Sequence, residues 1–482
     1  MAPAEGNVPT GVLMDEDAEA LSFPKIYCGK QRKFHQRITF GKIIKSDFKR
    51  YDRRCANNVT KLLYSYKKLQ IQQVVNQVSI AMRQRKNICN TAKNVTSNEN
   101  LEQLLDDNHG YRILKQIRGS PSYWKQVRSE MVAMVRQLGK PSLFGSFSAA
   151  ESEWLELITI LYKNNNKKDL NFEEAKNLSF NDKAELIRKY PITCAQYFDH
   201  RINKLIKEFI NKKNGPFKKY QVVDFDFRVE FQHRGSPHIH IIIWLLDAPI
   251  YHELKDNSDV IEFINSIITC NADHPLIKYQ THNHTHTCNK RKINNHKNNK
   301  SFTCRFNIPY PIMNRTMILQ PLGDDSNDQI KKVALNNYEK IKQKLNSLKD
   351  FKGLVTYENF LAELYLNENE YLLAIRSSIM RVTVFLKRES NEIFINGYNK
   401  DILDVHKANM DLQYVLDPHA CIAYMVNYIN KSNRGQSDII RAAIEESNNG
   451  NLTLRQKLSL IGNSFLNSTE VSAQEAAYII LG

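Results

Sequence analysis

Two histidines separated by one residue could together hold a metal ion. His238 and His240 flank Ile239 within residues 228–244, where a Gly-Ser-Pro turn predicts a β-hairpin. Alternate residues of a strand point to the same face, so the two imidazoles would lie side by side. A metal held there could polarise a phosphodiester. On its own, the pattern also fits an exposed strand with two incidental histidines.

The first strand of the hairpin offers a third ligand. Glu230 and Gln232 are two residues apart, so they would share a face and lie next to the histidines. Two neutral imidazoles and an oxygen donor suit Mn²⁺, or Mg²⁺ that keeps several waters. His233 would point to the opposite face, as a contact with solvent or DNA.

Two tyrosines far downstream could supply a nucleophile. Tyr424 and Tyr428 are four residues apart in residues 417–432, a segment that predicts a helix with Pro418 in its first turn, and Lys431 follows on the same face. Tyrosine can act as a covalent nucleophile, but its pKa of about 10 requires a site that favours the phenolate. A metal ion and Lys431 could provide this. Alternatively, the tyrosines form a packed aromatic stripe and Lys431 only compensates the helix dipole.

A second group of potential metal ligands lies within residues 265–310. The preferred zinc ligands are Cys270, His284, Cys288 and Cys304, with His282 as a substitute. Thiolates and imidazoles are the usual ligands of tetrahedral structural zinc. The spacing is not that of a standard zinc finger, so a disordered basic loop with free thiols is the alternative. The basic residues between Cys288 and Cys304 could contact phosphates in either case.

The segments around these residues predict an α+β fold. Helices are expected over residues 151–212, with a break near Pro191, and through a basic N-terminal region, residues 21–135. Residues 1–20 are acidic and expected to be disordered. Besides the histidine strand of the hairpin, strands are expected at residues 143–147, 222–231, 380–386 and 412–416.

Composition narrows the class of protein. A chain of 482 residues, 42% hydrophobic, can bury a large core and form two or more domains. Its net charge of +17 favours a polyanionic partner such as nucleic acid, although an acidic protein also fits. The sequence has no apolar run that predicts a membrane span, no secretory signal at its start and no P-loop. Its eight cysteines indicate reduced thiols or metal ligands rather than disulfides.

Taken in order, these motifs resemble the replication-initiator (Rep) domain of Helitron transposons, a two-tyrosine member of the HUH endonucleases. His238-Ile239-His240 matches the His-hydrophobic-His signature, and residues 230–237 match its surroundings. Further similar segments are residues 21–24, 144–154, 197–201, 304–309 and 410–418, so the resemblance covers roughly residues 20–482.

The resemblance implies metal-dependent nicking of single-stranded DNA and strand transfer through a 5′-phosphotyrosine, as in rolling-circle transposition. It implies an antiparallel RRM-like or ferredoxin-like palm backed by helices, in a Rep domain over residues 136–482. Among the possible third ligands it favours Gln232, with Glu230 second. Residues 21–135 would be an accessory DNA-facing domain or, alternatively, a solvated helical domain. The expected partner is single-stranded DNA at transposon ends, in the nucleus and without a membrane.

Two rival functions remain at the level of sequence. A degenerate or domesticated copy would bind DNA or RNA without chemistry, although the core motif residues are all present. A structural Cys/His protein would bind RNA through its charge, without metal dependence and without a covalent adduct. Relatives continue into a helicase domain, whereas this chain ends at a segment resembling the junction before it, so we expect a Rep-only fragment, a truncated gene copy or a shortened product.

Overall fold

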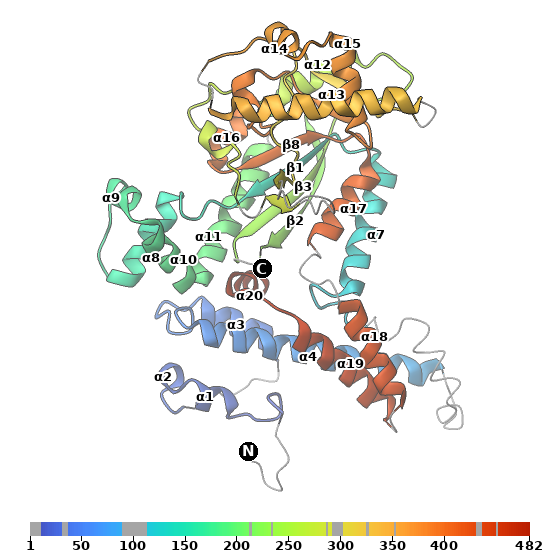
Figure 1. Cartoon of the computed structure of the whole chain (residues 1–482). Coiled ribbons are helices and arrows are strands. Elements are labelled where there is room, and N and C mark those ends of the chain that lie inside the picture. Colours follow the sequence, from blue (N-terminus) through green and yellow to red (C-terminus); the bar gives the residue numbers. More distant parts are fainter. Residues whose placement is uncertain are drawn as a thin grey trace.

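The computed structural model is an α+β protein in which helices surround a four-stranded sheet (Figure 1). This confirms the fold class expected from the sequence. The structure describes residues 11–30, 37–88, 113–211, 215–232, 235–285, 288–291, 302–323, 327–350, 353–429, 436–449 and 452–482.

The central sheet is antiparallel, with its strands in the order β2-β3-β1-β8. The strands are β1 (Leu143–Ser148), β2 (Val222–Phe231), β3 (Pro237–Leu245) and β8 (Met410–Tyr414). Strands β2 and β3 form the expected hairpin, and helical crossovers connect β1 to β2 and β3 to β8. The histidine strand β3 therefore lies inside the sheet, between β2 and β1.

The strand expected at residues 380–386 does not join this sheet. Only β7 (Thr383–Phe385) forms there, and it pairs with β6 (Met317–Leu319) in a separate two-stranded sheet. Another small sheet pairs β4 (Asn289–Arg291) with β5 (Phe302–Cys304). A β-branched run predicts a strand, but the pairing partner depends on tertiary context.

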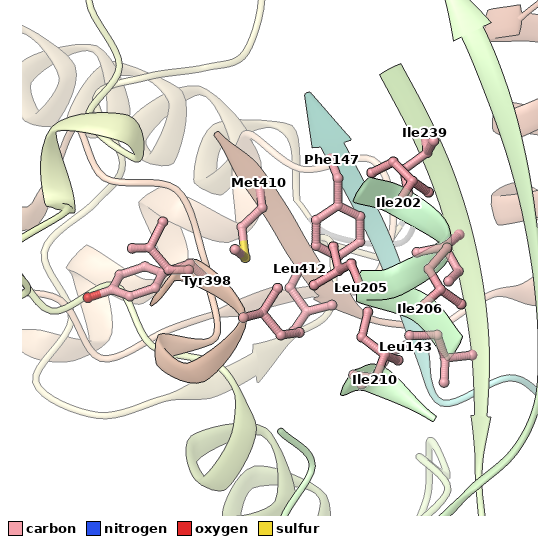
Figure 2. Close-up of a cluster of buried hydrophobic side chains, with 14 of the residues drawn as sticks. Leu143, Phe147, Ile202, Leu205, Ile206, Ile210, Ile239, Tyr398, Met410 and Leu412 are labelled. Carbon is pink, nitrogen blue, oxygen red and sulfur yellow. The ribbon is translucent and has the colours of Figure 1, made fainter. Parts of the chain in front are cut away.

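One face of the central sheet carries the main hydrophobic core. Leu143, Phe147 and Ile239 point from the strands toward Ile202 and Leu205 (Figure 2). The covering elements are α8 (Leu155–Asn166), α10 (Phe180–Lys189), α11 (Pro191–Lys204), the π-helical segment Leu205–Ile210, α12 (Ser258–Ile267) and α16 (Lys400–His406).

Gly145 on β1 allows the close packing of this face. A Cβ atom there would lie 2.9 Å from Ile241 Cγ2 and 2.9 Å from the ring of Phe147. Interiors this dense tolerate no extra methyl group without a shift of neighbouring atoms, so this strand position requires glycine.

The opposite face of the sheet is apolar at one end and polar at the other. Two helices, α7 (Pro121–Leu138) and α17 (Pro418–Ile429), cover the apolar end around Phe144 and Ile242. The expected boundary at residue 135 lies within α7, a helix that packs on this face of the sheet. Beyond Phe144 the same face carries hydrophilic side chains.

The N-terminal and C-terminal helices pack together in one layer (Figure 1). This layer contains α3 (Phe40–Phe48), α4 (Val59–Ile88), α18 (Gln436–Asn449), α19 (Leu454–Ser468) and α20 (Ala473–Leu481). The last helices of the chain thus share a core with its first ones, across the expected division into residues 21–135 and 136–482.

Helix also begins earlier than expected, within residues 1–20. Residues 1–10 lie outside the described part, but α1 (Ala18–Ser22) follows soon after. Its buried Glu19 forms an ion pair with the fully buried Lys61 of α4 and accepts a hydrogen bond from Tyr27 Oη. This pairing ties the start of the described chain to the helical layer.

Further helices pack at the periphery. A separate apolar cluster joins α13 (Asp328–Ser347), α14 (Tyr357–Leu364) and α15 (Glu368–Ser377), while α2 (Pro24–Tyr27) and α9 (Phe172–Asn177) are short. Among the helices that the structure describes, none is long and apolar enough to cross a membrane.

Candidate active site

The two histidines lie together on the polar part of the sheet face that α7 and α17 partly cover. The ring centroids of His238 and His240 are 4.9 Å apart. Because β3 is a regular strand between two partners, its alternation places both side chains on one face, as the sequence predicts. Only 1% of His240 is exposed, so it is shielded from bulk solvent.

Two serine hydroxyls bond to the ring nitrogens of His238. Ser146 Oγ lies 2.6 Å from Nε2, and Ser148 Oγ lies 2.9 Å from Nδ1. Both serines are on β1, which pairs directly with β3. Burial, together with His240 and His406, lowers the pKa of His238 to about 3. The ring is therefore neutral near pH 7, with one nitrogen protonated and the other carrying a lone pair.

Glu230 contacts the second histidine. Its Oε2 atom is 2.9 Å from His240 Nε2, across the β2-β3 hairpin. The side chain of Gln232 is instead exposed, beyond the last paired residue of β2. Of the two expected third ligands, the structure brings Glu230 to the histidines and leaves Gln232 in solvent. His233 lies outside the described residues.

Register places one polar residue from each strand in a row across this face. Arg228 is opposite His240, which is opposite Ser146, which is opposite Asp411. Arg228 forms ion pairs with Asp226, at 3.2 Å, and with Glu130 of α7, at 3.7 Å. At the far end of the row, burial raises the pKa of Asp411 to about 6, while a hydrogen bond from Gln413 opposes that shift.

Sequence reasoning missed the serines and Asp411. A signal was nevertheless present, because Ser146 and Ser148 alternate around Phe147 with the same two-residue period as the histidines. Asp411 also stands in a segment that resembles the Rep family. Only the strand order brings these three residues next to His238 and His240.

Residues on the opposite face of the sheet, which carries the main core, support the end of β1. His406 Nε2 donates to the backbone carbonyl of Ser148 at 3.0 Å, and burial lowers the pKa of His406 to about 3, so the ring is neutral. Arg201 donates to the carbonyls of Val405 and His406 at the end of α16 and stacks 4.8 Å from the ring of Trp154. The segments 144–154 and 197–201 thus position Ser148.

Tyr424 reaches this site from α17. Its ring is in edge-to-face contact with His240 and with Phe144, each at a centroid distance of 5.7 Å. The tyrosine is 44% exposed, whereas Ile422, Met425 and Val426 supply the packing of the helix. It is therefore not a member of a packed aromatic stripe.

The other expected members of the tyrosine helix are less fully described. Tyr428 lies on α17, one helical turn after Tyr424, but its side chain is outside the described part, and so is the whole of Lys431. The expected helix over residues 417–432 is described over Pro418–Ile429.

The Cys/His insert brings together four of its five candidate ligands. Donor atoms of His282, His284, Cys288 and Cys304 all lie within 4.8 Å of one another. Burial lowers the pKa of both histidines, which favours their neutral form. The thiol of Cys270 instead donates to the carbonyl of Lys387 at 3.1 Å, so the structure replaces the preferred Cys270 with the substitute His282.

Among the described residues, no other group of three or more His, Cys, Asp or Glu side chains brings its donor atoms this close together. His238, His240 and Glu230 lie side by side, but their donors are bonded to the serines and to one another.

A family model matches part of the chain. Residues 27–243 match the family model described as "Helitron helicase-like domain at N-terminus". Residues 27–243 are thus similar to the N-terminal helicase-like domain of Helitron transposons, which confirms the resemblance seen in the sequence for this part of the chain. The match includes His238 and His240 and ends before α17. Comparison with curated proteins and with solved structures found no match.

Proposed function

We propose that the protein is an HUH endonuclease that nicks and rejoins single-stranded DNA, with Tyr424 as nucleophile beside a metal held by His238 and His240. The observation that carries the proposal is the contact between Tyr424 and His240, two residues far apart in sequence. The strand order β2-β3-β1-β8 and the two helical crossovers support an RRM-like or ferredoxin-like palm.

The types of donor at this site suit a hard divalent cation, which would replace their present hydrogen bonds. His238 and His240 would provide imidazole nitrogens and Glu230 a carboxylate oxygen, a mixed set that suits Mn²⁺ or Mg²⁺ with remaining waters. Glu230 takes the place of Gln232 because its carboxylate already contacts His240. Such an ion supplies charge that polarises the scissile phosphate and stabilises its developing negative charge.

The serines would prepare His238 for this role. We assign the proton to Nδ1, which donates to Ser148 Oγ, so that Nε2 keeps the lone pair now held by the hydroxyl of Ser146. A hydrogen bond to the second ring nitrogen fixes the orientation of a metal-binding histidine. Ser146 would release Nε2 when the ion binds.

The chemical step needs no water. Tyr424 Oη bonds to phosphorus while the P–O3′ bond breaks, which leaves a 5′-phosphotyrosine and a free 3′ end. The phenol loses one proton and the departing 3′ oxygen gains one, so attack by a 3′-hydroxyl reverses the reaction and rejoins DNA. Partial exposure of Tyr424 leaves its ring accessible to a DNA backbone.

The proposed partner is single-stranded DNA at transposon ends, in the nucleus. The net charge of +17 supports a nucleic-acid partner. Because a basic protein attracts nucleic acid through many charges, DNA binding should not depend on the two histidines.

A nicking assay tests this function. Labelled single-stranded DNA should be cut in Mn²⁺ by the wild-type protein but not by His238→Ala or His240→Ala, while all three bind the DNA similarly. Tyr51→Phe is a suitable control, because Tyr51 is fully exposed. Nicking by the double histidine variant at the wild-type rate would reject the assignment.

A DNA- or RNA-binding module without chemistry is the second candidate. One observation favours it: both ring nitrogens of His238 are engaged by serine hydroxyls rather than open to a metal. Such a module would bind with the same affinity with or without Mn²⁺ and would leave the labelled DNA intact.

A further inference from the structure

We propose that His282, His284, Cys288 and Cys304 bind one structural zinc ion, and that Cys270 is not a ligand. None of the four contributes to the face that carries His238, so this site is separate from the proposed nuclease centre.

The separations of the donor atoms match the edges of a zinc tetrahedron. His282 Nε2 is 3.2 Å from His284 Nδ1, and Cys288 Sγ is 3.5 Å from that same Nδ1 atom. Cys304 Sγ is 3.6 Å from His282 Nε2. Ordinary Zn–N and Zn–S bonds in a regular tetrahedron require about 3.3 Å between two nitrogens and about 3.5 Å between nitrogen and sulfur.

The surroundings of the sulfur atoms also suit zinc thiolates. Cys288 and Cys304 are buried, at 2% and 8% exposure. The backbone N–H of Thr285 points at Cys288 Sγ from 3.3 Å, a donor that would stabilise a thiolate. Two sulfur and two nitrogen ligands favour Zn²⁺ over Mn²⁺ or Mg²⁺, and four protein ligands fill the coordination shell. The ion would therefore be structural rather than catalytic.

The ligands come from two segments that a zinc ion would join. His282, His284 and Cys288 precede β4, whereas Cys304 ends β5, and β4 pairs with β5. Among the described residues, this small sheet packs on a small apolar cluster around Ile308, so a metal ion would contribute much of its stability.

The zinc segment is bonded to the chain that leads into the central sheet. The N–H of His282 donates to the carbonyl of Phe394 at 2.8 Å, and the N–H of Tyr310 donates to Ile393 at 2.8 Å. Gln280 accepts from the N–H of Asn396 and, through its side chain, from the N–H of Met410, the first residue of β8. Zinc would thus brace the edge strand that carries Asp411.

Elemental analysis of the purified full chain tests the proposal. We expect about one zinc per chain in the wild type, and less than about a tenth of that in Cys304→Ser and in His282→Ala. Cys270→Ser is the matched control, because Cys270 is equally buried and lies in the same insert, yet it should keep the zinc. A folded wild type without zinc, or loss of zinc in Cys270→Ser but not in Cys304→Ser, would overturn the assignment.

A second measurement covers variants that fail to fold. Wild-type protein in which Co²⁺ replaces zinc should show the intense visible bands of a tetrahedral site and a thiolate-to-cobalt charge-transfer band. A weak octahedral spectrum without the charge-transfer band would contradict the four-ligand set. Neither readout depends on nicking, so failure of the nuclease proposal would leave this test unaffected.

Discussion

At the scale of single residues, the hydroxyls of Ser146 and Ser148 would decide which nitrogen of His238 can bind the proposed metal. Both serines contact the same ring, one at each nitrogen, so they are not equivalent. The hydroxyl on Nδ1 would orient the ring for metal binding, whereas the hydroxyl on Nε2 would compete with the metal.

Replacement of these two serines should therefore have different effects. Ser148→Ala should weaken Mn²⁺ binding by about 10- to 100-fold, because it removes the partner that fixes the ring. Ser146→Ala should leave the affinity unchanged or raise it, because it removes a competitor. Mn²⁺ titration followed by electron paramagnetic resonance measures both. The reverse order, with Mn²⁺ binding weakened in Ser146→Ala but not in Ser148→Ala, would show that the tautomer has been assigned to the wrong nitrogen.

The other residue-scale prediction concerns Asp411. Burial raises its pKa from 3.8 to about 6. A raised pKa favours the protonated carboxyl in the folded state, so this contribution to stability is complete below about pH 4 and is lost as pH rises through 6. Asp411→Asn should thus be more stable than the wild type at pH 8, by about 1–3 kcal/mol, and the gap should narrow at pH 5.

Thermal unfolding of both proteins at the two pH values measures this difference. A gap that is the same at pH 5 and pH 8 would mean that Asp411 does not titrate between them.

At the scale of elements, local periodicity predicted most strands but, apart from the β2-β3 hairpin, not which strands pair. The expected strand at residues 222–231 has the bounds of β2, and the face shared by His238 and His240 follows from alternation alone. Strand β7 was predicted as a strand, yet its pairing with β6 depends on contacts between distant residues.

The candidate zinc ligands also show how little sequence spacing says about contacts between distant residues. Cys270 and His282 were both candidates, and sequence spacing could not separate them. An isolated bridge between Thr281 and Ile395 precedes His282, which contacts His284 and Cys304. Cys270 instead follows a bridge between Thr269 and Tyr398 and contacts Lys387. Gln232 similarly follows Phe231, the last paired residue of β2, and its side chain is exposed.

Close contact between α4 and α19 gives an element-scale prediction. A Cβ atom at Gly462 would overlap Cγ1 of Val74, and a valine side chain can hardly move away from it. Gly462→Ala should destabilise the protein by about 1–3 kcal/mol, despite the better helix propensity of alanine. Gly41→Ala on α3 is the matched control, because its Cβ would lie 3.8 Å from Leu69 Cδ1.

The control variant should instead gain up to about 1 kcal/mol from helix propensity. Urea denaturation gives both values. If Gly462→Ala were as stable as Gly41→Ala, the contact between the two helices would be looser than the structure has it.

At the scale of the whole molecule, the two ends of the chain support the sheet from one side. Ala476, Ala477 and Ile480 of α20 are buried with Ile44 and Phe23, and Gly235 of the histidine hairpin lies next to Ser472. No sequence pattern predicted that the last helices would pack on the first. The site itself combines β1, β2, β3, β8 and α17, so its residues meet only when the whole chain has folded.

The contact between α17 and the histidine strand is also what the central claim depends on. Peptide mapping of the protein after incubation with single-stranded DNA and Mn²⁺ tests it most directly. The account predicts a nucleotide covalently bound to Tyr424 or Tyr428, lost in the Tyr424→Phe/Tyr428→Phe variant and retained in Tyr51→Phe. A covalent adduct that persists in the double variant would contradict it, because the nucleophile would then lie elsewhere.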